Sequence, residues 1–242
     1  MARELIQREW LRRVEAEYGS AALTHHLTLW LLQITAPFEL TRAGLAIVED
    51  ELAHAELSRA VQVAAGGTAS ARLERERLGL RLRPNEPLEL AVARTGLEAF
   101  CLGETVAVRL FSRLRQNAVE PVALAALDRI LRDEVRHRDF GWTLLEWLLD
   151  TPQAERVLGL VEAELPAMFA RLRNNYAFAS LGQVSEADPE AQRWGLMPMS
   201  DYAAALQETL ERDYVPRFAD HGIDARAAWN ALALDGAPDR AG

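Results

Sequence analysis

Lysine is missing from this sequence, because all 27 basic residues are arginine. That absence excludes chemistry that depends on a lysine Schiff base. A single cysteine, Cys101, excludes an intrachain disulfide and any cysteine-rich zinc or iron–sulfur site. We therefore expect a reducing, cytoplasmic location.

Long apolar runs and a surplus of basic charge are missing as well. No stretch approaches the ~18 apolar residues that a membrane-spanning helix needs. Residues 1–13 are charged and amphipathic, unlike a secretory signal. The formal net charge of −9 argues against a nucleic-acid backbone as the main partner. We therefore expect a protein that binds neither membranes nor nucleic acids.

Helical periodicity dominates the pattern that is present. Apolar residues recur every three or four positions, and only residues 78–82 alternate like an extended chain. The sequence predicts an N-cap at Ser200, a kink or break at Pro166 and a bend at Pro216. The expected helices cover residues 4–32, 40–65, 88–116, 121–149, 153–180 and 200–215, with a short one around Trp229. The chain is predicted to be all-α.

The spacing of the first four helices indicates their connectivity. Two helical pairs have short loops, and residues 66–87 join the pairs. A helix of this length spans about 40 Å, which an extended crossover of some 20 residues can cover. This is the connectivity of one class of four-helix bundle. We expect that bundle in residues 1–150 and a helical extension packed on it in residues 151–242.

A repeated motif carries the chemistry. Asp50, Glu51 and His54 fit the pattern D-E-x-x-H, and Asp133, Glu134 and His137 repeat it. One E-x-x-H is a weak signal, but two copies, each on the second helix of a pair, are far more specific. Positions i and i+3 share one helical face, so each copy directs a carboxylate and an imidazole to one point.

An upstream glutamate accompanies each motif. Glu17 precedes Glu51 by 34 residues, and Glu104 precedes Glu134 by 30. One helix up, a turn and one helix down bring each upstream glutamate level with its motif. The sequence therefore predicts that four carboxylates and two imidazoles converge in the bundle core.

Two Glu…E-x-x-H halves on a four-helix bundle resemble the ferritin-like di-iron carboxylate proteins. In detail, the strings AEYGSAAL, EDELAHAEL, CLGETVA and RDEVRHRDF are similar to bacterial ferritin-like domain proteins. The resemblance covers residues 10–150 and implies a ferritin-like bundle with two iron ions, Fe/Fe or Mn/Fe. The implied metal ligands are Glu17, Glu51, His54, Glu104, Glu134 and His137.

Elementary electrostatics agrees with that implication. Four buried carboxylates without cations cost several kcal/mol each, and two divalent ions balance their charge. Mixed oxygen and imidazole ligation suits iron or manganese. Asp50 and Asp133 are each expected to accept the free ring N–H of the histidine on the opposite motif helix. The resemblance implies the same pairing.

Three further residues are candidates for a pocket beside the metals. His25, Cys101 and Val108 lie one or two turns from the predicted ligands. For each of them the alternative is an ordinary structural role: a satisfied helix residue for His25, and core packing for Cys101 and Val108.

The predicted function is a dinuclear non-haem iron oxidase or oxygenase that uses O₂ to oxidise a small organic substrate, with an external electron donor. An alternative is a ferroxidase for iron storage or detoxification. A third hypothesis is a metal-stabilised helical module that binds a protein. A docked extension in residues 151–242 would obstruct cage assembly, so we expect a monomer or homodimer.

Overall fold

The computed structural model describes residues 2–74, 76, 78–179 and 188–231. Within these residues the regular structure is helical and no strand is present, as expected from the periodicity. The principal elements are α1 (Ala2–Gln33), α2 (Phe38–Ala64), α3 (Leu88–Thr95), η2 (Gly96–Glu104), α4 (Thr105–Asn117), α5 (Pro121–Leu149), α6 (Ala154–Ala179), α7 (Pro189–Arg193), α8 (Met199–Thr209), η3 (Leu210–Tyr214), α9 (Val215–Ala219) and α10 (Ala225–Ala231).

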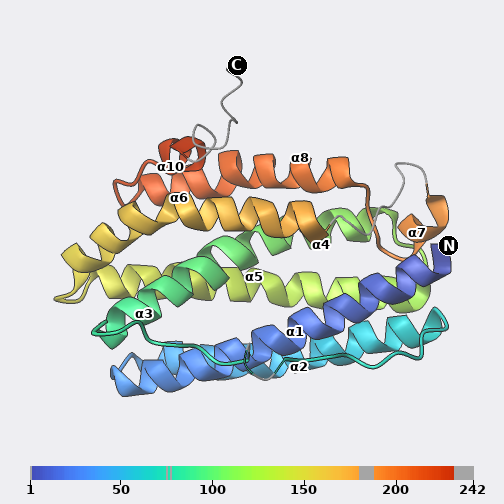
Figure 1. Ribbon diagram of the computed structural model, residues 1–242, viewed down its shortest axis with the longest axis horizontal. Helices are drawn as coiled ribbons and strands as arrows, with labels where there is room; N and C mark the ends of the chain where they lie inside the picture. Colours follow the sequence, from blue (N-terminus) through green and yellow to red (C-terminus); the bar gives the residue numbers. More distant parts are fainter. Residues whose placement is uncertain (1, 75, 77, 180–187, 232–242) are drawn as a thin grey trace, which may run out of the picture.

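The long helices lie in layers along the longest axis of the molecule (Figure 1). α1 packs along α2, and α2 packs on α5. α5 also contacts η2 and α4, while α6 and α8 cover the other side of this middle layer. No helix among the described residues is long and apolar enough to cross a membrane.

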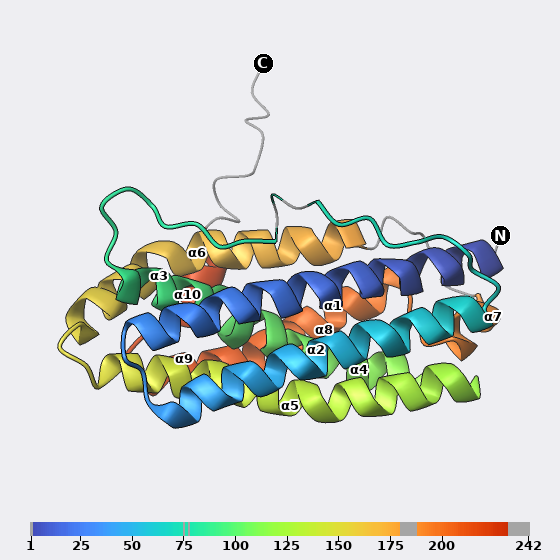
Figure 2. The ribbon, with the colours of Figure 1, turned by 90° about the horizontal axis from the view of Figure 1, so that it is seen from below.

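The segment between α2 and α3 runs back along the molecule, as Figure 2 shows. It leaves α2 at Gly66, whose φ of +89° is readily adopted only by glycine. The backbone N–H of Arg72 donates to Glu15 on α1, and the N–H of Leu80 donates to Nδ1 of His26 at 3.0 Å. These bonds hold the predicted crossover against α1.

The third long helix differs from the prediction in its winding. Residues 88–117 are continuously helical, but the nine residues Gly96–Glu104 form a π-helix that the apolar period did not indicate. Here η2 approaches α5 closely, because a Cβ on Gly141 would lie 2.5 Å from the Cβ of Phe100. π turns of this kind are frequent at functional sites.

The carboxyl-terminal helices differ from the sequence prediction in three places. The residue that precedes α8 is Pro198, so Ser200 lies inside the helix and is not its N-cap. α6 continues through Pro166, so no break occurs there, and helix also continues from α8 through η3 and across Pro216 into α9. α7 is a short helix that was not among the expected ones. Its N-cap is Asp188, which accepts two backbone N–H bonds.

The carboxyl-terminal helices pack on one another and on α5 through aromatic side chains, and Phe218 of α9 lies 5.1 Å from Trp142 of α5, centroid to centroid. Phe169 of α6 lies 5.4 Å from Tyr214 and 5.1 Å from Trp229, centroid to centroid. At the other end, the indole N–H of Trp10 donates to the carbonyl oxygen of Trp194 at 2.9 Å. Burying one large aromatic side chain contributes roughly 1.5–3 kcal/mol, so these helices are firmly docked.

Candidate metal centre

Four helical segments bring six acidic and imidazole side chains together. Glu17 comes from α1, the first motif from α2, Glu104 from the last residue of η2, and the second motif from α5. Five of the six are buried, and Glu104 is partly exposed. This Glu/His cluster consists of Glu17, Glu51, His54, Glu104, Glu134 and His137.

The cluster divides into two sets of ligand atoms. Glu17, Glu51, His54 and Glu134 form one set, and Glu51, Glu104 and His137 form the other. Within each set the ligand atoms lie within 4.8 Å of one another, so each set could hold one metal ion. Glu51 belongs to both sets, as a carboxylate between two ions would.

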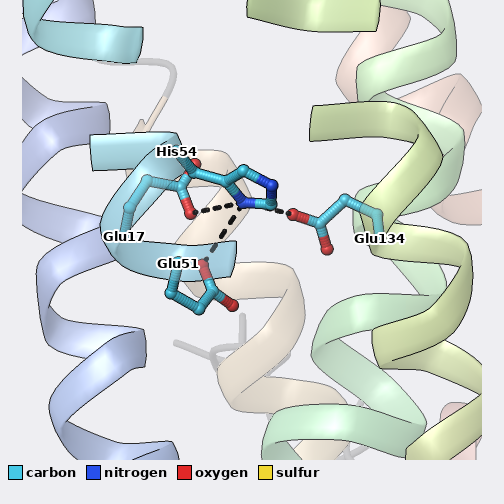
Figure 3. A group of neighbouring side chains, drawn as sticks. All are labelled: Glu17, Glu51, His54 and Glu134. Carbon is cyan, nitrogen blue, oxygen red and sulfur yellow. Dashed lines mark ion pairs between the residues drawn. The ribbon is translucent and has the colours of Figure 1, made fainter. Parts of the chain in front are cut away.

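Nδ1 of His54 lies at the centre of the first set (Figure 3). It is 3.9 Å from Glu17 Oε2, 3.6 Å from Glu51 Oε2 and 3.7 Å from Glu134 Oε1. These distances are too long for hydrogen bonds, and this buried atom has no hydrogen-bond partner. Two atoms that each lie ~2.1 Å from one ion are roughly 3.0–4.2 Å apart, so the spacing fits a cation between them.

The second imidazole repeats this arrangement. Nδ1 of His137 lies 3.4 Å from Glu51 Oε1 and 3.6 Å from Glu134 Oε2, and it too is buried without a hydrogen-bond partner. The two imidazole rings are 5.6 Å apart, centroid to centroid. Glu51 and Glu134 therefore each approach both histidines, which is the position of two bridging carboxylates.

The outer nitrogen of each imidazole faces an aspartate on the opposite motif helix. Nε2 of His54 lies 3.2 Å from Oδ2 of Asp133, and Nε2 of His137 lies 3.4 Å from Oδ2 of Asp50. The structure thus contains the pairing expected from the two motifs. With its proton on Nε2, each ring donates outward to an aspartate and leaves the Nδ1 lone pair directed into the cluster.

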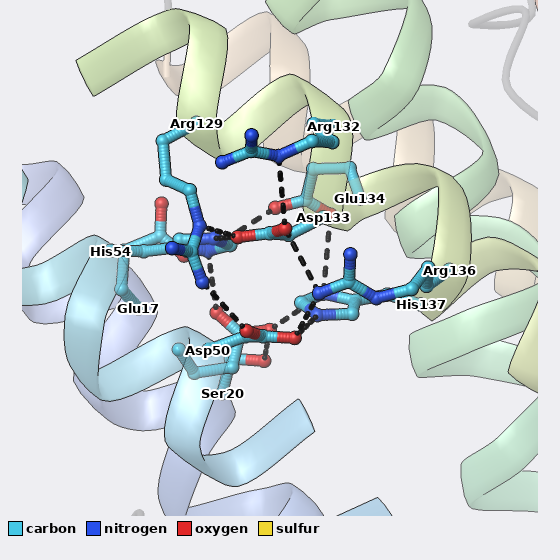
Figure 4. A network of polar contacts seen from close by, with 11 residues as sticks. Glu17, Ser20, Asp50, His54, Arg129, Arg132, Asp133, Glu134, Arg136 and His137 are labelled. Carbon is cyan, nitrogen blue, oxygen red and sulfur yellow. Dashed lines mark hydrogen bonds and ion pairs between the residues drawn. The ribbon is translucent and has the colours of Figure 1, made fainter. Parts of the chain in front are cut away.

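Three arginines of α5 surround the two aspartates on their outer side, as Figure 4 shows. Arg136 lies 2.8 Å from Asp50 and 2.9 Å from Asp133, and Arg129 pairs with the same two carboxylates. Arg132 approaches Asp133 at 3.7 Å. Burial alone would raise the pKa of Asp133, but hydrogen bonds from Arg129 and His54 hold it below its usual range. Asp133 therefore remains an ionised acceptor.

Without metal, the inner carboxyl groups disfavour a full set of negative charges. Burial, together with the neighbouring glutamates, raises the pKa values of Glu17, Glu104 and Glu134 well above the ordinary glutamate value. Burial would also raise the pKa of Glu51, but the nearby imidazoles of His137 and His54 lower it. Burial opposes a charge on His137, yet Glu51 and Glu104 raise its pKa. Divalent cations would displace these protons and neutralise the carboxylates.

The π-helix contributes to the position of Glu104. Each residue that a wide turn accommodates rotates the following side chains by about 100° relative to an ideal α-helix. Glu104 ends η2, so its direction toward the cluster depends on that winding. The spacing from Glu104 to Glu134 is four residues shorter than that from Glu17 to Glu51, and η2 changes the register on the Glu104 side.

Of the three candidate pocket residues, none completes the cluster. His25 is exposed and lines a separate groove between α1 and α2, because eight residues past Glu17 correspond to a rotation of about 80°. Val108 lines a cavity beside α8. Cys101 is fully buried in the core, and burial raises the pKa of its thiol. His25 and Val108 therefore line other concave surfaces than the Glu/His cluster, and Cys101 has the packing position that its alternative described.

Several residues that support the cluster were not predicted. Ser20 donates a hydrogen bond to Oε1 of Glu51 at 2.9 Å, and Arg129 and Arg136 hold the aspartates. The arginines could have been found, because they lie four residues before and three residues after Asp133 on one helical face. For Ser20, the sequence offered only its closeness to Glu17 as an indication of a role at the cluster.

Comparisons with protein-family models, curated proteins and solved structures give no match to this chain.

Proposed function

We propose that this chain is a ferritin-like, dinuclear non-haem iron protein that activates O₂ to oxidise a small organic substrate. The observation that carries the proposal is the pair of buried Nδ1 atoms without hydrogen-bond partners, which face four glutamates. In the proposed fold, α1, α2, the segment from α3 to α4, and α5 form the four-helix bundle. The crossover at residues 66–87 joins its two halves.

The donor set favours iron or manganese as the bound metal. Carboxylate oxygens and imidazole nitrogens suit these ions, and within the described residues no thiolate takes part, because Cys101 lies in the core. Two divalent cations bring four positive charges, which equal the charge of four ionised glutamates. We propose Fe/Fe occupancy, with Mn/Fe as the other candidate.

The residues of the chain would prepare and protect the centre. Asp50 and Asp133 fix the ring tautomer of the two histidines, so that both Nδ1 atoms remain free to bind metal. The arginines on α5 form ion pairs with those aspartates, and burial of the cluster excludes bulk water. Bound ferrous iron would supply electrons for the reduction of O₂. An external donor is then required for repeated turnover.

The docked carboxyl-terminal helices favour an oxygenase or oxidase over iron storage. α6 packs on α3, η2 and α5, and α8 packs on α4. A storage cage must pack many copies of a bundle side by side, and helices that cover one side of the middle layer restrict that packing (Figure 1). We therefore propose a monomer or homodimer, with ferroxidase storage as the second candidate.

The test is anaerobic loading with ferrous iron, followed by a pulse of O₂. We expect up to two metal ions per chain, stoichiometric O₂ uptake in a single turnover and no mineral core. The double substitution Glu51→Ala with Glu134→Ala should abolish metal binding, because it removes both carboxylates that approach both histidines. The double substitution Glu49→Gln with Glu56→Gln, at exposed positions of α2, is the control.

Three results would contradict the proposal in different ways. Equal metal content in the Glu51/Glu134 double variant and the wild type would refute the ligand assignment. A large shell that accumulates an iron mineral, detected by light scattering, would favour the storage function. Metal binding without O₂ uptake would favour the third hypothesis, in which the metal only stabilises a protein-binding module.

A further inference from the structure

A polar cavity of about 540 Å³ lies between α4 and the segment formed by α8 and η3, apart from the Glu/His cluster. Two of its lining residues, Thr105 and Arg138, directly follow Glu104 and His137 in sequence. Consecutive helical residues point about 100° apart, so these two side chains face away from the cluster. α8 lies against α4 on this side of the molecule (Figure 1). The cavity is therefore a second concave site, built by other side chains.

The charge of this cavity is positive although the chain is acidic. Arg109, Arg113 and Arg138 line it together with only two acidic residues, Glu208 and Asp213. The hydrogen bond from Arg113, followed by the charges of nearby arginines, lowers the pKa of Glu208, so both charges of that pair persist at neutral pH. Just outside the wall, Asp139 pairs with Arg138 at 2.8 Å and Arg212 pairs with Glu208 at 3.5 Å. Four arginines thus face three acidic residues, so one positive charge is left over in a chain whose formal net charge is −9.

Arg113 also has N–H donors that are not used in hydrogen bonds to the described residues. Arg113 donates one bond, from NH2 to Glu208 at 2.9 Å, although a guanidinium group carries five N–H donors. Within the described residues its other donors have no protein partner. Its side chain is 27% exposed, so its charge is partly desolvated and interacts with an anion more strongly than a fully solvated arginine does. Ser112 and Gln116 add polar groups to the wall, and Val108 is its one apolar residue.

We propose that this cavity binds a small, polar organic acid with a single carboxylate. Arg113 is its principal ionic partner, and the hydroxyl of Ser112 and the amide of Gln116 contact the polar remainder of the molecule. The volume lies in the range of small-molecule sites and exceeds the need of a bare inorganic ion. The polar wall disfavours an apolar acid, and the single excess charge favours a monoanion.

The experiment is titration calorimetry on protein stripped of metal with a chelator. The probes are gluconate, sorbitol and inorganic phosphate. Sorbitol is the polyol without the carboxylate, and phosphate is the anion without the polar chain. We expect saturable binding of gluconate, no measurable binding of sorbitol, and weaker binding of phosphate than of gluconate.

Arg113→Gln is the test variant, and Arg212→Gln is its matched control. Both arginines pair with Glu208, Arg212 at 3.5 Å, but only Arg113 lines the cavity, and Arg212 is 70% exposed. Arg113→Gln should weaken gluconate binding at least about tenfold, as expected for a charged hydrogen bond. Arg212→Gln should change it by less than about twofold.

Three outcomes would overturn this assignment: no saturable gluconate binding, equal loss in both variants, or phosphate binding as tightly as gluconate. Because the titration uses metal-free protein, its result is independent of the proposed dinuclear centre. Gluconate binding by a protein that takes up no iron would leave the cavity assignment intact and reject the proposed function alone.

Discussion

The hydroxyl of Tyr214 donates a hydrogen bond to the carbonyl oxygen of Leu102 at 2.6 Å and so connects the two π-helical segments. Tyr214 is the last residue of η3, and Leu102 lies in η2, two residues before Glu104. Tyr214 is fully buried against Phe169. A residue of the carboxyl-terminal helices thereby supports the backbone that places a member of the Glu/His cluster.

Tyr214→Phe should lower the free energy of unfolding by about 1–3 kcal/mol, because it leaves a buried carbonyl without this donor while the ring still packs. It should also weaken metal binding, because Glu104 loses support for its position. Tyr18→Phe is the control, since Tyr18 is 43% exposed on α1. Denaturant unfolding and iron titration check both effects. Unchanged iron affinity in the Tyr214 variant would show that η2 holds Glu104 without this bond.

Asp133→Asn should reduce metal affinity about 10–100-fold without removing a metal ligand, because the amide no longer offers His54 an ionised acceptor. Asp128→Asn, on an exposed ion pair of the same helix, should leave affinity unchanged. Competition with a chromogenic chelator measures both variants. An equal effect of the two substitutions would contradict an orienting role for Asp133.

The metal-free protein should lose stability as the pH rises above the ordinary glutamate range. The pKa of Glu17 is raised in the folded state by burial and then by Glu51, so the folded chain holds a proton that the unfolded chain releases. The resulting penalty is absent below the ordinary glutamate value of 4.5 and grows as the pH rises from there toward the folded-state pKa.

Glu17→Gln removes this penalty, so the variant should gain stability over wild type as the pH goes from about 5 to about 8. Glu49→Gln, at an exposed position on α2, should show no such trend. Denaturant unfolding of metal-free samples at both pH values provides the measurement. A stability difference between Glu17→Gln and wild type that stays constant with pH would rule out a raised pKa at Glu17.

Metal loading should stabilise the folded chain. Binding to the native state alone adds about 2.7 kcal/mol at a hundredfold excess of free metal over Kd. Melting curves with and without chelator measure the shift, and the Glu51/Glu134 double variant should show none. Identical melting temperatures of metal-loaded and metal-free wild type would argue against a buried site.

The all-helical character of the chain and the approximate bounds of its long helices were accessible from sequence, because each long helix carries an apolar period and clear stop signals. The two D-E-x-x-H motifs located both histidines and both cross-helix aspartates. The π winding of η2 was not accessible, because the apolar period does not indicate it; where it occurs, η2 and α5 lie too close for a Cβ at Gly96 or Gly141. His25 does not share the face of Glu17, because eight residues exceed two full helical turns by about 80°. Thr24, seven residues past Glu17, is buried instead.

His54 pairs with Asp133, and His137 pairs with Asp50. Neither half of the sequence therefore contains all the residues of the site. The imidazole of His54 on α2 is oriented by a carboxylate of α5, and the imidazole of His137 on α5 is oriented by a carboxylate of α2. A fragment with only the first helical pair would lack the acceptor for its own histidine. Two copies of such a fragment, arranged face to face, would restore the exchange. Each half of the chain thus provides the aspartate that orients the histidine of the other half.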